Sequence, residues 1–178
     1  MKPHVRVLLS SLLLGSAAAT ENPASVAELF GTLENFQLVR EAGRVDVCIL
    51  RHIEPTPRAD SSIDRSTERY EETAFTPVPA ATATVLRYLV LDEKTYDWKA
   101  TGGRRPQFYL RLRFRRGEEV IALDFCFTCH VLSVTRQGVE LGHANFSPNG
   151  DLFLRAFLKI FPDDAPLRQV AKEAGLPP

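Results

Sequence analysis

Three residues near the middle of the chain have the types and the spacing that can do chemistry. The segment Cys126-Phe127-Thr128-Cys129-His130 matches the C-x-x-C-H pattern. In that pattern two thiols add to the vinyl groups of haem, and the histidine becomes an axial ligand of the iron. The same thiols can instead bond to one another. We take a disulfide or redox pair as the leading interpretation, and covalent haem c on Cys126, Cys129 and His130 as the alternative.

The sequence around the motif favours the disulfide. Residues 120–134 are rich in β-branched and aromatic side chains, which is typical of a strand, whereas haem of this type normally sits against helices. Methionine, a common sixth ligand, occurs only as Met1, which leaves His52 and His143 for that position. A zinc site made by the three motif residues and one of these two histidines is a weaker alternative. An adjacent Cys and His rarely bind one ion from a strand, so we predict no metal site.

A disulfide within the motif requires the chain to bend there. In a straight strand Cys126 and Cys129 would lie about 10 Å apart, at roughly 3.3 Å per residue, whereas a disulfide needs Cα atoms within about 7 Å. The apolar positions are odd-numbered at 121–127 and even-numbered at 132–134. This change of phase predicts a β-bulge or a tight bend. Cys48 is a third possible partner, so the connectivity among the three cysteines stays open.

A second candidate binding group lies in the strand before the motif. Arg111, Arg113 and Arg115 alternate with apolar residues and therefore share one face of that strand. No acidic residue lies between Asp97 and Glu118. The three arginines are a candidate anion-binding patch. A solvated sheet face that discourages pairing at the sheet edge is the simpler interpretation, and we favour it.

The strands expected to position these residues form an antiparallel meander. Residues 108–115 alternate strictly in polarity, which predicts a half-buried strand. A two-residue loop at Arg116-Gly117 then predicts a hairpin in which Leu112 faces Ile121. The other expected strands are residues 44–52, with Cys48 on one face, and residues 131–136 and 139–146, joined by a turn at Gln137-Gly138.

Helices are expected before and after this meander. Residues 25–28 have the pattern of a capping box, and apolar residues at helical spacing continue to Phe36. The next helix is expected to place Val85 in the core, and Asn149 and Asp164 are expected to cap two more. The predicted fold class is α+β: an antiparallel β meander of about four to five strands, packed against N-terminal and C-terminal helices.

The first residues predict the destination of the chain. Residues 1–19 match a secretory signal peptide, because a basic start precedes an apolar run at 5–14, and Ala17 and Ala19 fit an A-x-A cleavage site. The apolar run is shorter than the roughly 20 residues needed to cross a bilayer. We therefore expect export to the periplasm or the cell exterior, with residues 20–178 forming a single α+β domain.

Composition narrows the expected partners. Lys+Arg and Asp+Glu both number 22, and this balance argues against nucleic acid as the partner. No later segment is apolar enough for stable membrane insertion, and the polar residues 54–73 are expected to form an exposed loop. Because the sequence contains no convergent catalytic set, we expect a non-enzymatic binding or structural module. Its partner would be an unidentified protein or small molecule, and it would hold no cofactor.

Residues 105–162 resemble a group of uncharacterised exported bacterial proteins. Members carry a proline before an alternating strand, then an apolar strand ending in Cys-Phe-x-Cys, then a helix and Phe-Pro. The matching residues here are Pro106, Cys126-Phe127-Thr128-Cys129 and Phe161-Pro162. The resemblance implies that His130 is incidental, because the residue after the second cysteine varies in the group. Arg105 replaces a further cysteine of the group, and no activity, cofactor or substrate follows from the resemblance.

Overall fold

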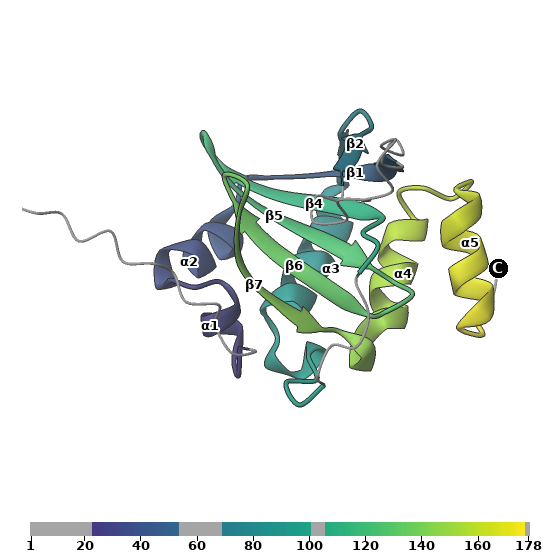
Figure 1. Cartoon of the computed structure of the whole chain (residues 1–178). Coiled ribbons are helices and arrows are strands. Elements are labelled where there is room, and N and C mark those ends of the chain that lie inside the picture. The colour runs from purple at the N-terminus through teal and green to yellow at the C-terminus, as the bar shows by residue number, and fades with distance from the viewer. Residues whose placement is uncertain (1–22, 54–68, 101–105, 177–178) are drawn as a thin grey trace, which may run out of the picture.

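The computed structural model describes residues 23–53, 69–100 and 106–176 (Figure 1). The expected signal peptide and most of the expected loop at 54–73 lie outside these residues. The helices are α1 (Val26–Leu29), α2 (Leu33–Glu41), α3 (Ala80–Leu91), α4 (Gly150–Leu158) and α5 (Ala165–Glu173), with short 3-10 helices η1 (Glu93–Thr95) and η2 (Ser147–Asn149). The strands are β1 (Arg44–Ile53), β2 (Arg69–Glu72), β3 (Thr76–Pro77), β4 (Leu110–Arg116), β5 (Glu119–Cys126), β6 (Val131–Arg136) and β7 (Val139–Asn145).

The fold is α+β, as predicted, and is built on one antiparallel sheet. The described strands lie in the order β2-β1-β4-β5-β6-β7, with β3 beside β1. The described part of the sheet has seven strands rather than four to five, because two short segments without alternating polarity add to its β1 edge. In Figure 1, α3 lies behind the sheet, α1 and α2 lie at one end, and α4 and α5 lie at the other.

The helices cover one face of the sheet, which we call the inner face. On β4 the inner face carries Leu110, Leu112 and Phe114, each 0 % exposed. Phe125 of β5 lies at the centre of an aromatic cluster, with ring centroids 5.1–5.6 Å from three other phenylalanines: Phe146, Phe153 and Phe157. Burying one such side chain contributes about 1.5–3 kcal/mol, so this cluster is a principal source of stability.

The β4–β5 hairpin is shifted by two residues from the predicted register. Leu112 faces Leu123 rather than Ile121, and the two-residue loop is Gly117-Glu118. Gly117 has φ +60°, a conformation that favours glycine at the first loop position. A shift of two keeps every side chain on its predicted face, since side chains alternate with a period of two. The shift places Arg111 directly opposite Asp124.

The predicted turn at Gln137-Gly138 is confirmed, with φ +53° and +79°, and β6 has the predicted bounds. The expected first helix is instead two helices, because Gly31, at φ +73°, interrupts it between α1 and α2. Val85 is 48 % exposed rather than buried, since α3 turns Leu86 and Leu89 to the core.

Of the two predicted helix caps, one forms a capping hydrogen bond and the other does not. The Asp164 carboxylate accepts a hydrogen bond from the Leu167 amide at 2.9 Å and caps α5 as predicted. Asn149 precedes α4, but its side chain makes no cap hydrogen bond to that helix. Instead it donates to Thr95 Oγ1 at 3.2 Å, which ties η1 to the start of α4.

Residues 69–72, which the sequence placed in an exposed loop, form β2 against β1. β3 pairs with the same side of β1, and the register shifts by one residue between Glu72 and Thr76. The segment 69–77 is therefore one interrupted edge strand with an irregularity near Phe75. The Phe75 ring lies over the Arg113 guanidinium, whose carbon is 3.0 Å from the ring centroid.

Candidate functional site

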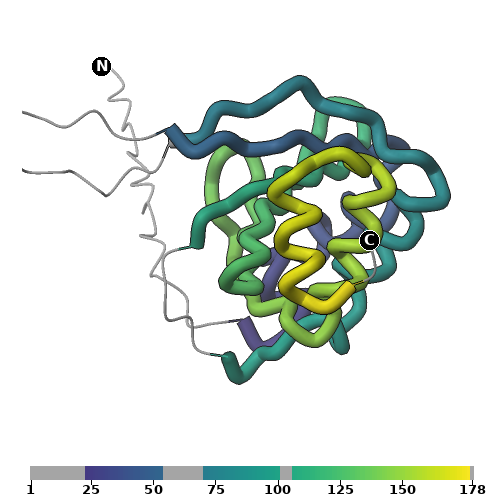
Figure 2. The backbone as a smooth tube through the Cα atoms, turned by 90° about the vertical axis from the view of Figure 1, so that its right-hand side faces the viewer, coloured from purple at the N-terminus to yellow at the C-terminus, as the bar shows by residue number. Residues whose placement is uncertain are grey.

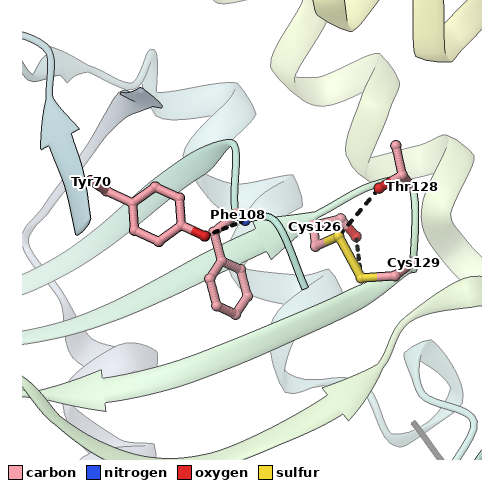
Figure 3. Close-up of a disulfide and its surroundings, with 5 residues drawn as sticks. All are labelled: Tyr70, Phe108, Cys126, Thr128 and Cys129. Carbon is pink, nitrogen blue, oxygen red and sulfur yellow. Dashed lines mark hydrogen bonds between the residues drawn. A yellow bond between two sulfur atoms is a disulfide. The ribbon is translucent and has the colours of Figure 1, made fainter. Parts of the chain in front are cut away.

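The cysteine motif occupies the connection between β5 and β6. β5 ends at Cys126, which pairs with Val131 at the start of β6, so residues 127–130 form a tight loop. His130 takes up φ +55° in that loop. The Cα atoms of Cys126 and Cys129 lie 5.7 Å apart, and the two sulfurs form a disulfide (Figure 3). The predicted bend is thereby confirmed, and the disulfide joins the two motif cysteines.

The disulfide loop is anchored on both sides. Cys126 is 1 % exposed, and its sulfur lies 3.5 Å from the hydroxyl oxygen of Thr128. Phe127 is 4 % exposed and packs against Phe125, with ring centroids 6.0 Å apart. Cys129 is only partly buried, and Thr128 is exposed. The loop therefore presents Thr128 and Cys129 outwards while its aromatic residue lies in the core.

Cys48 takes no part in the disulfide and is the free cysteine of the three. Its side chain is 0 % exposed on β1. Burial is the main reason that the pKa of its thiol is raised to about 11. Cys48 is therefore a buried neutral thiol at physiological pH.

Covalent haem would need both motif sulfurs as free thiols, whereas in the structure they are bonded to one another. Cys126 is also buried, with 1 % of its surface exposed. The His130 ring lies over α4, where a Cβ added to Gly150 would come within 3.1 Å of its Cδ2 atom. Of the two expected sixth ligands, His143 contacts Glu140 at 2.9 Å, and His52 lies in a cleft described below. Within residues 23–53, 69–100 and 106–176, no three or more His, Cys, Asp or Glu residues are grouped to hold a metal ion.

The predicted arginine patch lies on the sheet face opposite the helices, which we call the outer face. Arg111 makes a two-pronged ion pair with Asp124, with both nitrogen–oxygen distances at 2.6 Å, and it also contacts Glu72. The hydrogen bonds to Asp124 raise the pKa of the Arg111 guanidinium. Anion binding by this patch stays a prediction, but its first arginine is already matched by two carboxylates.

The other two arginines of the patch surround a buried carboxylate that the sequence analysis did not identify. Asp46 of β1 is 0 % exposed and accepts a hydrogen bond from Arg44 Nε at 2.7 Å. Its other oxygen lies 3.3 Å from Arg115 Nε and 3.7 Å from Arg113 Nη2. Asp46 could have been found from the β1 alternation, because it shares a face with Cys48. The pairing of β1 with β4 is a long-range contact that the sequence pattern does not reveal.

The structure adds a site that the sequence did not predict, a cleft of about 550 Å³ between the end of β1, the start of β4, the disulfide loop and α5. Figure 2 looks onto α5, with β1 crossing above it. The residues lining the cleft are Ile49, Leu50, Arg51, His52, Gln107, Phe108, Tyr109, Phe127, Thr128, Asp164, Pro166 and Val170. The lining is mainly apolar or aromatic, with a few polar groups among these residues.

Tyr109 fixes the geometry of the cleft. Its amide donates to the Phe125 carbonyl at 2.8 Å, and its carbonyl accepts from the Leu50 amide at 2.8 Å. Its hydroxyl donates to Asp164, with both carboxylate oxygens 2.8 Å away. Burial and the bond to Asp164 raise the pKa of Tyr109. The residue therefore ties the start of α5 to the strands at a fixed distance.

Two rings that line the cleft, His52 and Phe108, are contacted from β2. Tyr70 packs against His52, with ring centroids 5.6 Å apart, and against Phe108, at 6.3 Å. The Phe108 amide donates to the Tyr70 hydroxyl at 3.2 Å, and Figure 3 shows this contact beside the disulfide. The disulfide loop supplies the adjoining wall through Phe127 and Thr128. Sequence reasoning missed the cleft because its walls come from segments far apart in the chain.

Arg51 is exposed and is the arginine among the described residues that line the cleft. Among the described residues no carboxylate lies within ion-pair distance of it, in contrast to the three arginines of the outer face. It lies close enough to Tyr109 for its charge to act on the pKa of that hydroxyl.

The described helices include none that is both long and apolar enough to cross a membrane.

A search of protein-family models, curated proteins and solved structures finds no match for the chain.

Proposed function

We propose that the protein is an exported, non-enzymatic binding module that takes a small-molecule ligand in the cleft beside its disulfide. The observation that carries this proposal is the cleft itself. Its volume of about 550 Å³ lies within the range of roughly 300–1,000 Å³ that is typical of ligand sites. Apolar walls with a few fixed polar groups are the usual lining of such sites.

The polar groups of the cleft support binding rather than catalysis. Tyr109 and Asp164 are bonded to one another, and Asp164 also caps α5. The Thr128 hydroxyl oxygen lies against the sulfur of Cys126. These contacts hold the groups in place. The raised pKa of the Tyr109 hydroxyl keeps it protonated, so it is a weak nucleophile although Asp164 accepts its hydrogen bond.

The disulfide supports both the site and the export. It closes the loop that contributes Phe127 and Thr128 to the cleft wall. Disulfides persist in oxidising compartments outside the cytosol, which agrees with the signal-peptide pattern of residues 1–19.

Binding of N-phenyl-1-naphthylamine, an uncharged dye that fluoresces in apolar sites, tests the proposal. We expect saturable, one-site fluorescence with the wild-type protein. Val170→Trp on α5 and Thr128→Trp in the disulfide loop fill the cleft from two walls, and each should weaken binding at least tenfold. Val85→Trp, on the exposed face of α3, is the matched control and should leave binding unchanged. Equal binding by all four proteins, each with an unaltered circular dichroism spectrum, would refute the site.

Covalent haem c on Cys126, Cys129 and His130 is the alternative function, and electron transfer would follow from it. The intact mass under denaturing, non-reducing conditions decides between the two. The protein should be exported by a host that has the cytochrome c maturation system. We expect the mass of the chain with one disulfide and one alkylatable thiol. An added haem would replace the binding proposal with the alternative.

A further inference from the structure

Several arginines elsewhere on the molecule have guanidinium groups in contact with a carboxylate. Arg111, Arg113 and Arg115 contact the carboxylates of Asp46, Glu72 and Asp124. Arg116 and Arg136 likewise contact carboxylates, with Glu119 lying between them at 3.0 and 2.7 Å. Within the described ranges Arg51 has no carboxylate within ion-pair distance, although Glu71 is its register partner on β2.

Asp164, the carboxylate among the described residues that line the cleft, does not form an ion pair with Arg51. Both oxygens of Asp164 accept from the Tyr109 hydroxyl at 2.8 Å, and Oδ1 also accepts from the Leu167 amide. The charge of Asp164 therefore faces Tyr109 and the positive N-terminal end of the α5 dipole. Asp164 and Arg51 line the same cleft without forming an ion pair.

The surroundings of Arg51 favour an anion with an apolar body. Ile49, Phe108 and Val170 line the same cleft and limit the water around a bound ligand. Attraction between opposite charges increases as water is excluded. A guanidinium matches a carboxylate with two parallel hydrogen bonds, the geometry that Arg111 and Asp124 already have at 2.6 Å.

We propose that the ligand of the cleft carries a carboxylate that pairs with Arg51, while its apolar body lies against Phe108 and Val170. This inference rests on the proposed function, because it assigns the ligand class to the same cleft. A free carboxylic acid and the C-terminal carboxylate of a short peptide share this chemistry. The experiment below separates these two sources.

Titration calorimetry with acid and amide pairs tests the inference. The probes are 4-phenylbutyrate and 4-phenylbutyramide, and acetyl-Leu-Phe with a free carboxylate or a C-terminal amide. We expect at least one acid to bind the wild-type protein about fivefold tighter than its amide, the strength of a partly exposed ion pair. The pair that shows the larger preference identifies the source of the carboxylate.

Variants at Arg51 assign the preference to a residue. Arg51→Gln should abolish the preference for acid while retaining the affinity for the amide, and Arg51→Lys should restore part of it. Arg155→Gln is the matched control. Arg155 lies exposed on α4, and no described carboxylate forms an ion pair with it. This control should keep the wild-type preference.

Failure of the inference can be told apart from failure of the proposed function. Equal binding of acid and amide, or a preference that survives Arg51→Gln, would overturn the carboxylate while leaving the cleft as a binding site. Absence of binding by all four probes, together with saturable dye binding, would also overturn the carboxylate alone. Dye binding that ignores Val170→Trp and Thr128→Trp would overturn both proposals.

Discussion

The outer face of the sheet and the cleft beside the disulfide both carry arginines. They differ in whether a carboxylate lies within ion-pair distance of the guanidinium. On the outer face, Asp46 and Asp124 lie against the guanidiniums of the neighbouring strand, and both carboxylates are almost fully buried. In the cleft, Arg51 is exposed and has no carboxylate partner among the described residues. The position of the counter-charge, rather than the number of arginines, is the reason for which we propose a binding role for Arg51 alone.

The largest expected loss of stability comes from a substitution on the outer face of the sheet. Asp46→Asn keeps the shape of the side chain but removes the buried charge, which leaves Arg44 and Arg115, directly opposite one another, without a counter-ion. We expect the free energy of unfolding in urea to fall by about 3–5 kcal/mol. Asp163→Asn is the control, because its side chain is 94 % exposed, and it should change stability by less than about 0.5 kcal/mol. A loss of less than about 1 kcal/mol in unfolding free energy for Asp46→Asn would contradict the structural role of this charge.

Removing the disulfide tests whether this bond holds the wall of the cleft in place. The Cys126→Ser/Cys129→Ser double variant reopens a short loop, and the chain-entropy model gives a loss of about 2 kcal/mol in unfolding free energy. Phe127 should stay in the core, because its ring contacts Phe146 and Phe157 independently of the sulfurs. Dye titration and urea unfolding of the same sample measure both effects. A loss of dye binding as complete as that of Val170→Trp would show that the disulfide, and not the packing of Phe127, holds the wall.

The buried thiol of Cys48 gives a prediction at alkaline pH. Its pKa is raised to about 11 in the folded chain from an ordinary value of 9.0, so the native state keeps a proton that the unfolded chain has lost. Stability from this group is present below pH 9 and is lost as pH rises towards 11, by roughly 3 kcal/mol in total. Urea unfolding at pH 8, 9 and 10 should show a steeper decline for the wild type than for Cys48→Ala. Parallel curves would mean that Cys48 titrates alike in both states.

The smallest effect is expected at Arg51. Since this side chain has no described ion-pair partner, Arg51→Gln should change the free energy of unfolding by less than about 0.5 kcal/mol. Thermal and urea unfolding of this variant beside Asp46→Asn complete the comparison of the two regions. Destabilisation by more than about 1 kcal/mol would place Arg51 among the structural arginines and would weaken the case for a free cation in the cleft.

Local patterns predicted the parts of the fold that depend on neighbouring residues. The alternation of 108–115 identified the inner face, and the change of apolar phase after Phe127 identified the bend between Cys126 and Cys129. The β4–β5 register was predicted two residues away, because both registers place apolar residues opposite one another. Gly117 decides between them through its positive φ.

Long-range pairings account for what the sequence did not reveal. The short strand β2 has no alternation of its own and is held by its ladder to β1. Asp46 is the counter-ion of arginines more than 60 residues away along the chain, and Asp164 is bonded to Tyr109, 55 residues earlier. The disulfide could be weighed from spacing alone, whereas the cleft depends on where α5 lies relative to the end of β1.

The interrupted edge beside β1 has a consequence for how molecules of this protein meet. An uninterrupted edge strand offers a continuous row of N–H and C=O groups onto which a second sheet can grow. Here the shift in register near Phe75 breaks that row, and Pro77 has no N–H to donate. A strand from a second folded molecule therefore cannot form a continuous ladder of hydrogen bonds with this edge. This edge disfavours the strand-by-strand growth that leads to fibrils, even at high protein concentration.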